Sequence, residues 1–283
     1  MKSIGIALGG GGVRGLAHVL AIEVFDEFGI VPKAIAGTSI GSLIGALYAS
    51  GRSGREIREG VREHIILKED RFQELRRKRR TLFQWLKFFR PAPTHGAILS
   101  PDGFLHYLLD QLAVETFEEL KIPFYAVATD YDARERVIFE QGPLLPALKA
   151  SMAIPGVFEP VMHEGRVLVD GGVVENLPHP VIAGKCDAVI AIDVIPSAVP
   201  GNGEPPKMID SLLGTFDTMT ERATKEAVEN CPPAIYLRTN PKGIRILDFD
   251  RIEEVYDQAA PAMDELRRKL ELLLDRGSEG SDS

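Results

Sequence analysis

The chain has 283 residues, of which 45% are hydrophobic and 26% are charged, and its formal net charge is −8. This length and composition predict one large α/β domain with a substantial buried core, and the acidic balance argues against nucleic acid as a partner. Two cysteines are too few for a disulfide framework and favour a reducing, cytoplasmic environment. No signal peptide is recognisable and no apolar run approaches about 18 residues, so we expect a soluble protein or one peripheral at the inner membrane face.

Short apolar runs of strand length alternate with longer helical patterns along the chain. Such alternation is typical of a three-layer α/β/α fold with a mostly parallel central sheet. We expect one domain over residues 1–275 and a polar, disordered tail over residues 276–283. The expected strands cover residues 3–8, 33–36, 122–129, 135–139, 166–169, 187–194 and 233–238. The expected helices cover residues 15–28, 39–50, 101–112, 143–151, 207–230 and 250–275.

The first expected strand runs into a glycine-rich loop whose residues Gly10–Gly15 fit the pattern G-x-G-x-x-G. A dinucleotide site with this pattern needs an acidic residue about 20 positions further on, and a P-loop needs a Gly-Lys-Ser/Thr sequence. The second strand instead ends in Ala36–Ser39, which holds no carboxylate, and no such lysine follows the glycines. Backbone N–H groups of a glycine loop can bind an anion. An oxyanion hole is the favoured interpretation, beside a nucleotide-phosphate site and a purely structural turn.

The second expected strand ends in a serine turn, Gly37-Thr38-Ser39-Ile40-Gly41, which has the G-x-S-x-G pattern of a nucleophile elbow. Glycines on both sides let the strand and the helix approach closely while the serine hydroxyl points out over the sheet edge. The N-terminus of the following helix adds a partial positive charge, which favours a developing alkoxide. The alternatives are a chance occurrence of the pattern and a serine that only caps the helix.

A serine nucleophile also needs a base, for which the chain offers histidines and an aspartate. His163 and His179 lie late enough in the chain, but neither follows a strand, and both are interpreted as ordinary polar residues. Asp170 ends the expected strand 166–169 and precedes Gly171-Gly172. Ligands bind outside the carboxyl ends of strands in such sheets, so a carboxylate there could accept the serine proton directly. The alternative is that Asp-Gly-Gly forms only a turn.

Three blocks in this order resemble the patatin-like phospholipase family: Gly10–Gly15, Gly37–Gly41 and Asp170–Gly172. The segment Ala150–Phe158 is similar to a further block of that family, and the resemblance covers roughly residues 4–195. The chain looks most like the small, stand-alone bacterial members. One departure is Ile40, where the family often has alanine, and it would narrow the floor beneath the serine.

The resemblance implies a serine esterase that cleaves carboxylic ester bonds of phospholipids or other acyl lipids. Ser39 would be the nucleophile and Asp170 the general base of a catalytic dyad, which needs no metal ion and no cofactor. The oxyanion hole would consist of Gly10, Gly11, Gly12 and Arg14. The other motif glycines are Gly15, Gly37, Gly41, Gly171 and Gly172. The alternative functions are a regulatory or adaptor protein on the same fold and an acyltransferase, and an intact dyad argues against the adaptor.

Residues 71–90, within an insert at about 65–96, depart from the acidic composition of the chain. They hold eight basic residues against one acidic residue, a local charge of +7, with aromatic side chains between them. A lid over the active site, a peripheral contact with an anionic membrane and a surface for a protein partner are the three interpretations of this pattern. Nothing in the sequence indicates an oligomeric state.

Overall fold

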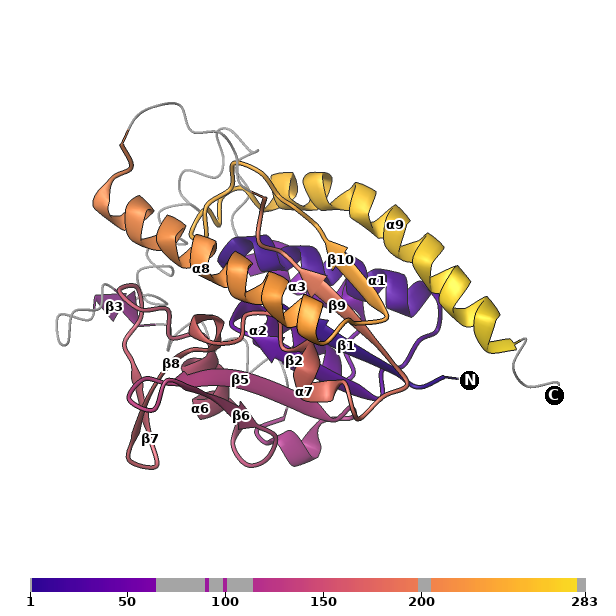
Figure 1. Ribbon diagram of the computed structural model, residues 1–283, viewed down its shortest axis with the longest axis horizontal. Coiled ribbons are helices and arrows are strands. Elements are labelled where there is room, and N and C mark those ends of the chain that lie inside the picture. The colour runs from indigo at the N-terminus through magenta and orange to yellow at the C-terminus, as the bar shows by residue number, and fades with distance from the viewer. Residues whose placement is uncertain (1, 65–89, 92–98, 101–113, 198–204, 279–283) are drawn as a thin grey trace.

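The computed structural model describes residues 2–64, 90–91, 99–100, 114–197 and 205–278, and Figure 1 labels its elements. The strands of the main sheet are β1 (Ile4–Leu8), β2 (Ala34–Thr38), β5 (Phe124–Asp130), β6 (Glu135–Phe139), β7 (Val161–His163), β8 (Arg166–Asp170), β9 (Ala188–Asp193) and β10 (Ile235–Arg238). A separate antiparallel pair consists of β3 (Arg90–Pro91) and β4 (Leu99–Ser100). The α-helices are α1 (Ala17–Glu27), α2 (Ile40–Ala49), α3 (Gly54–His64), α6 (Leu144–Ser151), α7 (His179–Ile182), α8 (Met208–Asn230) and α9 (Ile252–Ser278). Short 3-10 helices are η1 (Gly12–Leu16), η2 (Phe117–Glu119) and η3 (Gly171–Val173).

The main sheet is parallel in one part and antiparallel in the other. Its strand order is β10-β9-β1-β2-β5-β8-β7, and β6 also pairs with β5. The strands from β10 to β5 run parallel to one another. β6, β8 and β7 are joined by antiparallel pairings. The sheet is therefore mostly parallel, as expected, with an antiparallel end.

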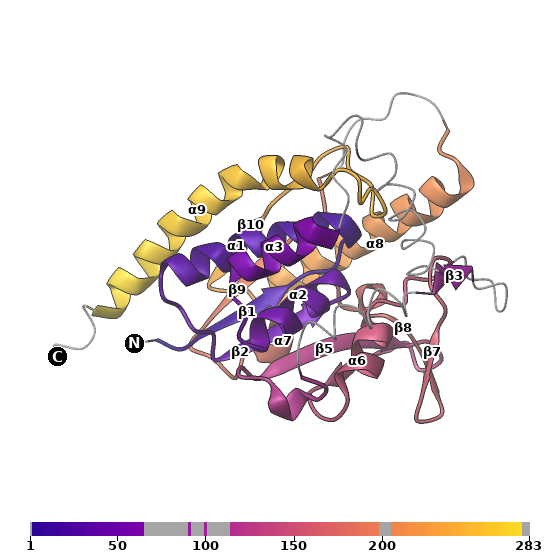
Figure 2. The ribbon, with the colours of Figure 1, turned by 180° about the vertical axis from the view of Figure 1, so that it is seen from behind.

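Helices cover both faces of the sheet, which confirms the three-layer α/β/α fold. Figure 1 looks onto the face that carries α7 and α8, and Figure 2 shows α1, α2, α3 and α6 over the opposite face. Successive strand residues point to opposite faces. Ile6 and Ile35 belong to the core on the α1 and α2 side, whereas Ala7 and Ala36 belong to the core that includes Ile182 of α7. The alanines let the short helix α7 lie close to the strands.

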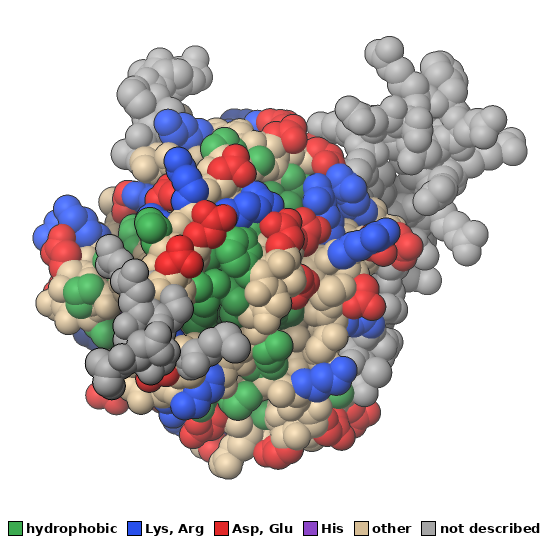
Figure 3. Space-filling view, turned by 90° about the vertical axis from the view of Figure 1, so that its right-hand side faces the viewer, with side chains coloured by type: hydrophobic (Ala, Val, Ile, Leu, Met, Phe, Trp, Pro, Cys, Tyr) green, Lys and Arg blue, Asp and Glu red, His purple; other side chains and the backbone are tan. Residues whose placement is uncertain are grey.

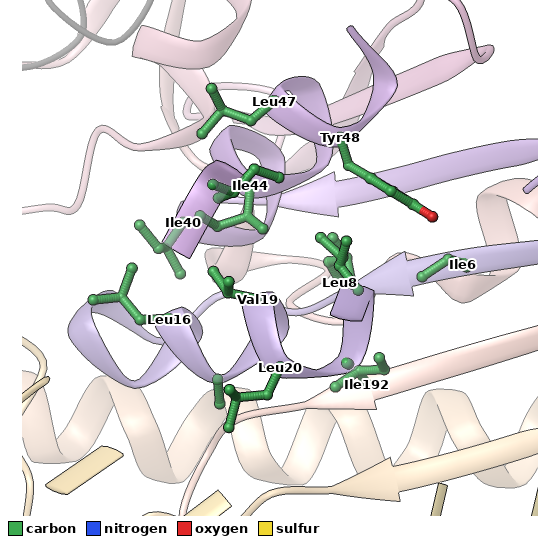
Figure 4. Close-up of a cluster of buried hydrophobic side chains, with 14 of the residues drawn as sticks. Ile6, Leu8, Leu16, Val19, Leu20, Ile40, Ile44, Leu47, Tyr48 and Ile192 are labelled. Carbon is green, nitrogen blue, oxygen red and sulfur yellow. The ribbon is translucent and has the colours of Figure 1, made fainter. Parts of the chain in front are cut away.

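The larger core fixes the two helices that follow β1 and β2. Figure 4 shows Leu16 and Val19, from η1 and α1, together with Ile44 of α2, gathered near Leu8 of β1. These side chains are all at most 2% exposed. Each such buried aliphatic side chain contributes about 1.5–3 kcal/mol relative to an exposed one. The packing therefore holds α1 and α2 firmly, and with them the loops at the carboxyl ends of β1 and β2.

Strands β2 and β8 meet end to end along one edge of β5. Thr38, at the end of β2, is opposite Val127, and Asp170, at the end of β8, is opposite Ala128. β6 occupies the other edge of β5 over this stretch, so β2 and β8 must share an edge. Because β2 runs parallel to β5 and β8 runs antiparallel to it, both strands end at the same point. The residue after Thr38 is therefore brought next to Asp170.

All the expected strands are present, with ends that differ by at most two residues, and five of the six expected helices lie within the described residues. The charged helix α3 was missed because its buried face consists mainly of Ile57 and Val61, which are too few to reveal a period. The three-residue strand β7 was missed as well. Helix α9 continues through residues 276–278 of the expected tail. The expected helix 101–112 and most of the insert at 65–96 lie outside the described residues.

The described surface carries both signs of charge. In Figure 3, which looks at the molecule from the right-hand side of Figure 1, acidic and basic side chains intermingle around a central group of hydrophobic ones. Such mixing fits a chain whose net charge of −8 is moderate for its length. Within the described ranges, every helix is too short or too polar to span a lipid bilayer.

Candidate active site

Ser39 lies on a tight turn between β2 and α2. It directly precedes the first residue of α2, and its backbone has φ 53° and ψ −126°. A positive φ is strained for a residue that carries a side chain, and such strain is frequent at functional residues. A Cβ on Gly37 would lie 2.5 Å from the Gly41 carbonyl oxygen, and a Cβ on Gly41 would collide with the Leu8 carbonyl oxygen. Both flanking positions therefore have room only for glycine.

The backbone of the serine turn is held by two other serines. The Ser39 N–H donates to Ser151 Oγ at 2.9 Å, and the Ser151 hydroxyl donates to the Val127 carbonyl of β5 at 2.7 Å. On the helix side, the Ser42 hydroxyl donates to the Ser39 carbonyl at 2.6 Å. These hydrogen bonds fix the backbone of Ser39 and leave its side chain on the wall of a narrow cavity.

Asp170 is a buried carboxylate at the end of β8. It is 1% exposed, and its Oδ1 accepts the Gly172 N–H at 2.7 Å. Its other oxygen, Oδ2, has no hydrogen-bond partner among the described residues. Burial raises the pKa of Asp170 to about 7, although the nearby Ser39 hydroxyl and the Gly172 N–H both favour the charged form. The carboxyl group therefore changes its protonation state near neutral pH and has one oxygen free to take a proton.

Ser39 and Asp170 face the same cavity. A Cβ on Gly171 would collide with the Val127 carbonyl oxygen and lie 3.0 Å from Thr38 Cγ2, so the ends of β2 and β8 are in contact. The Thr38 hydroxyl also donates to the Glu175 carbonyl at 2.9 Å, which ties the segment after Asp170 to β2. The cavity is lined by Gly10, Gly11, Gly12, Ser39, Ile154, Asp170, Asn176, Ile195, Phe216, Asp217 and Ile246. A serine hydroxyl, a base with a pKa near 7 and backbone N–H groups are the components of an acyl-transfer site.

The glycine loop after β1 borders this cavity, but its three glycines differ. The Gly10 N–H donates to the Asn176 carbonyl at 3.1 Å, so this N–H is already occupied. A Cβ on Gly10 would lie 3.2 Å from the Ser39 Cβ, which shows how closely the loop approaches the serine. Within the described residues, the Gly11 and Gly12 N–H groups have no hydrogen-bond acceptor. The N–H groups of Gly11 and Gly12 are therefore the free donors of this loop among the described residues, whereas the Gly10 N–H already has an acceptor.

Arg14 has a contact that differs from the expected one. Its side chain is 1% exposed, its Nε donates to the Gly11 carbonyl at 3.0 Å, and its two terminal nitrogens donate to the carboxylate of Asp217 at 2.9 and 2.7 Å. Asp217 belongs to α8. The guanidinium group therefore forms a bidentate ion pair with Asp217 and a hydrogen bond to the loop backbone, and its direct contact with an oxyanion stays a prediction.

The remaining motif positions are packed closely. A Cβ on Gly15 would collide with the side chain of Ile40, which is 2% exposed and belongs to the hydrophobic core. The isoleucine that departs from the family pattern thus fills a space next to Gly15. A Cβ on Gly172 would lie 2.9 Å from Asn176 Oδ1. The turn after Asp170 is consequently as tightly packed as the turn around Ser39.

Neither histidine considered as a base takes part in the cavity. His163 lies in β7, where its ring makes an edge-to-face contact with Phe139 at 5.1 Å between centroids. His179 is 1% exposed, and its two ring nitrogens lie 3.0 Å from the Leu177 carbonyl oxygen and 2.8 Å from the Cys231 carbonyl oxygen. Both rings therefore have structural contacts, and the titratable residues that line the cavity within the described part of the chain are Asp170 and Asp217.

Sequence reasoning missed three residues around the cavity. Ser151 lies in the segment Ala150–Phe158, which resembled a family block but suggested no role for its one hydroxyl side chain. Asn176 lies six residues after Asp170 and next to another polar residue, Glu175, so the local sequence does not single it out. Asp217 is one of several acids on a mostly polar helix, and it lies 203 residues from its partner, so no local pattern could reveal it.

Comparison with known proteins gives consistent matches. The family model of the patatin-like phospholipases matches residues 6–182. An uncharacterized NTE family protein of Mycobacterium tuberculosis is 34% identical over 232 residues, which cover 78% of this chain and 59% of that protein. Patatin-like phospholipase domain-containing protein 6 of Mus musculus is 30% identical over 90% of this chain and 20% of its own length. Lysophospholipase nte1 of Aspergillus fumigatus is 26% identical over 90% of this chain and 17% of its own length.

The chain belongs to the patatin-like phospholipase family, because the family model matches more than half of its residues. This confirms the resemblance seen in the sequence. The matched residues include the glycine loop, the serine turn and Asp170, and they end before α8 and α9. The chain spans less than two thirds of the length of these relatives, between 17% and 59%.

Proposed function

We propose that this protein is a serine hydrolase that cleaves carboxylic ester bonds of acyl lipids, with Ser39 as nucleophile and Asp170 as general base. The observation that carries the proposal is the buried carboxylate beside the strained serine turn, with a pKa of about 7 and one oxygen free of partners. A general base works best when its pKa is near the working pH. A carboxylate in water, with a pKa near 4, would be too weak to activate a serine hydroxyl.

The first half of the reaction forms an acyl-enzyme. Ser39 Oγ attacks the ester carbonyl carbon and forms a C–O bond, while the hydroxyl proton passes to Asp170 Oδ2. The carbonyl electron pair moves onto the oxygen, and the Gly11 and Gly12 N–H groups donate hydrogen bonds to it. When the intermediate collapses, the bond to the leaving alcohol breaks, and Asp170 returns the proton to the departing oxygen. One oxyanion donor is typically worth about 3 kcal/mol of the barrier.

The second half releases the acyl group to water. Asp170, again a carboxylate, takes a proton from a water molecule that attacks the acyl carbon, and the same two N–H groups stabilise the second tetrahedral intermediate. The Ser39 oxygen recovers a proton from Asp170 as the fatty acid leaves. The cycle needs no further reactant, so the chain's own residues and water account for every proton.

An apolar substrate is supported by the walls of the cavity and by the family. Ile154, Phe216 and Ile246 line the cavity beside the catalytic groups, and they belong to a separate apolar cluster with Val157 and Phe158. Such a wall suits a hydrocarbon chain. The relative from Aspergillus fumigatus is named a lysophospholipase. Contact of residues 71–90 with an anionic membrane remains a prediction, because nearly all of these residues lie outside the described part of the chain.

The test is covalent labelling with a fluorophosphonate, followed by mass spectrometry of the peptides. We expect labelling at Ser39 in the wild type and a much slower reaction in D170N, with S50A, altered at the far end of α2, as the matched control. Labelling of another residue would disprove the nucleophile. Hydrolysis of a phospholipid in ¹⁸O-water then separates the alternatives: a hydrolase puts ¹⁸O into the fatty acid, an acyltransferase forms a new ester with an added alcohol, and an adaptor does neither.

A further inference from the structure

We propose that Asn176 and the ion pair of Asp217 with Arg14 are positioning elements, which aim the Gly11 and Gly12 N–H groups at the oxyanion. The inference rests on the proposed function and adds to it a link between α8 and the catalytic loop. The hydrogen bonds to the carbonyl groups of the glycine loop carry the inference, because the direction of a carbonyl fixes the direction of the N–H in the same peptide unit.

A trans peptide unit is planar, so its C=O and the following N–H point in opposite directions. The Asn176 side-chain amide donates to the Gly10 carbonyl at 3.2 Å, which turns the Gly11 N–H away from Asn176. Arg14 Nε donates to the Gly11 carbonyl at 3.0 Å, which turns the Gly12 N–H away from Arg14. Two successive carbonyls are thus tied back, and both N–H groups lie on residues that line the cavity.

The peptide unit before these two is held in the same way. His18 Nε2 lies 2.8 Å from the Gly9 carbonyl oxygen, and because burial lowers the pKa of His18 to about 4, the ring is neutral and carries its proton on Nε2. The next N–H, of Gly10, is taken by the Asn176 carbonyl. His18 and Asn176 are 0% and 3% exposed. Three consecutive carbonyls, those of Gly9, Gly10 and Gly11, are therefore bound by buried side chains.

Asp217 decides whether Arg14 can hold its carbonyl. The guanidinium group of Arg14 is buried, and its terminal nitrogens bind both oxygens of Asp217. Without Asp217, the buried charge would lose its partner, and the arginine would have to turn toward other acceptors. Asp217 itself is 25% exposed and lies on α8 beside Phe216, which borders both Gly172 and the cavity. A shift of α8 would therefore reach the oxyanion donors through this ion pair.

The experiment compares N176A, D217N and D217E with Y48F. Tyr48 is a matched control, because it lies at the end of α2 opposite to Ser39. Its buried hydroxyl donates a hydrogen bond to Asp26 of α1. Turnover of a p-nitrophenyl ester is expressed per active site, counted by fluorophosphonate labelling, so that unfolded protein does not contribute. We expect kcat to fall roughly 100-fold in N176A and roughly tenfold in D217N, with KM within about twofold, because misplacing one oxyanion donor costs up to about 10²–10³ in rate. D217E, which keeps the charge, should recover part of the loss.

A trifluoromethyl ketone provides a second readout that a merely structural role would not move. It forms a tetrahedral adduct on the serine whose oxygen occupies the oxyanion position. Its inhibition constant should rise by the same factor by which kcat/KM falls, and Y48F should change neither. If the inhibition constant stays constant while kcat falls, or if kcat per site stays within twofold of the wild type in both N176A and D217N, the positioning role is wrong. If N176A does not fold, D217N provides the same test of the positioning role.

The proposed function and the positioning role can fail separately. A wild-type protein that neither hydrolyses the ester nor labels at Ser39 contradicts the proposed function. In that case ¹⁵N relaxation of the loop still decides the second question, because it needs no turnover. A lower order parameter for the Gly11 N–H in N176A, relative to Y48F, supports the positioning role, and equal order parameters overturn it.

Discussion

The parallel and the antiparallel parts of the sheet supply different components of the candidate site. In the parallel part, β1 and β2 each run into a glycine-containing turn and then a helix, and these turns carry the N–H groups and the serine. In the antiparallel part, β8 runs back along β5 and delivers the carboxylate. β5 has seven residues and β2 has five, so β5 extends beyond β2 and offers β8 a place to pair. An insertion or shift in either part would separate Ser39 from Asp170.

The two parts also differ in how their turns are stabilised. The serine turn rests on a large hydrophobic core, since α2 is buried along its whole length. The turn after β8 is held mainly by polar contacts, such as the bond between Gly172 N–H and Asp170 and the bond between Thr38 and Glu175. We therefore expect changes in either part to lower activity, through the proposed nucleophile in the parallel part and the proposed base in the antiparallel part.

The largest effect is expected from S39A, which removes the proposed nucleophile from the parallel part. Hydrolysis of a short-chain p-nitrophenyl ester should fall by about 10⁴-fold or more, as in other serine enzymes that lose their nucleophile. The melting temperature should stay close to that of the wild type, because the Ser39 N–H and C=O keep their hydrogen bonds to Ser151 and Ser42. The control is S50A, at the other end of α2. Activity close to the wild type in purified S39A would mean that another residue attacks the ester.

D170N tests the antiparallel part and should be nearly as damaging. Asparagine keeps the shape and can still accept the Gly172 N–H, but it cannot take the serine proton. Loss of a general base typically costs about 10²- to 10⁴-fold in rate, measured here as kcat of the same ester. H163A and H179A are the comparison variants. If one of them removes activity while D170N retains it, a histidine is the base and the dyad is wrong.

The pH dependence of the wild type sharpens the same assignment. In the proposed mechanism the active form of Asp170 is the carboxylate, and burial raises the pKa of this group to about 7. The value of kcat/KM should therefore fall as pH decreases through about 7, approaching a tenfold loss per pH unit below it. Rates corrected for spontaneous hydrolysis between pH 5 and pH 8.5 give the midpoint. A profile that stays flat down to pH 5 would show that the base has an ordinary carboxylate pKa.

Alanine substitutions at Gly37 and Gly171 test how closely the backbone is packed in the parallel and the antiparallel part of the sheet. A Cβ on Gly37 would lie 2.6 Å from Ser42 Cα, and a Cβ on Gly171 would meet the Val127 carbonyl, so neither backbone can give way easily. We expect G37A and G171A each to lower the free energy of unfolding by about 1–3 kcal/mol or more in urea titrations. The control is G60A in α3, where a Cβ meets nothing within 4 Å and should stabilise the helix by up to about 1 kcal/mol. Equal effects of all three would contradict the close contacts.

The elements that follow from the sequence are those with a local pattern. The strand–glycine–helix units at Ser39 and at the glycine loop are local, and so the two turns could be placed before the structure was known. Asp170 was located by the rule that ligands bind at the carboxyl ends of parallel strands. In the structure β8 is antiparallel to β5, and Asp170 reaches the cavity along the overhang of β5 rather than at the end of a parallel strand.

The parts that sequence reasoning missed depend on contacts between distant residues. The ion pair of Arg14 with Asp217 joins residues 203 positions apart, and the bond from Asn176 to Gly10 spans 166 positions. An arginine in a glycine loop suggests a direct contact with an anion, since its carboxylate partner cannot be seen in the local sequence. The burial of Asp170, which sets its pKa, likewise arises only when α8, β5 and the glycine loop assemble around it.

The last expected effect concerns stability, and it has the opposite sign to the effect on activity. Because the pKa of Asp170 is raised from 3.8 to about 7 in the folded protein, the folded state holds a proton that the unfolded state has lost between these two pH values. The wild type should therefore lose stability as pH rises through this range, by at most about 1.4 kcal/mol per pH unit from this group. D170N has no charge to bury, so its unfolding free energy should exceed that of the wild type at pH 8 and match it near pH 4. Urea titrations at both pH values measure the difference, with Y48F as control. If the difference in unfolding free energy between D170N and the wild type is the same at pH 8 and at pH 4, burial does not destabilise the carboxylate. Asp170 would then lack the raised pKa on which its proposed role as a base depends.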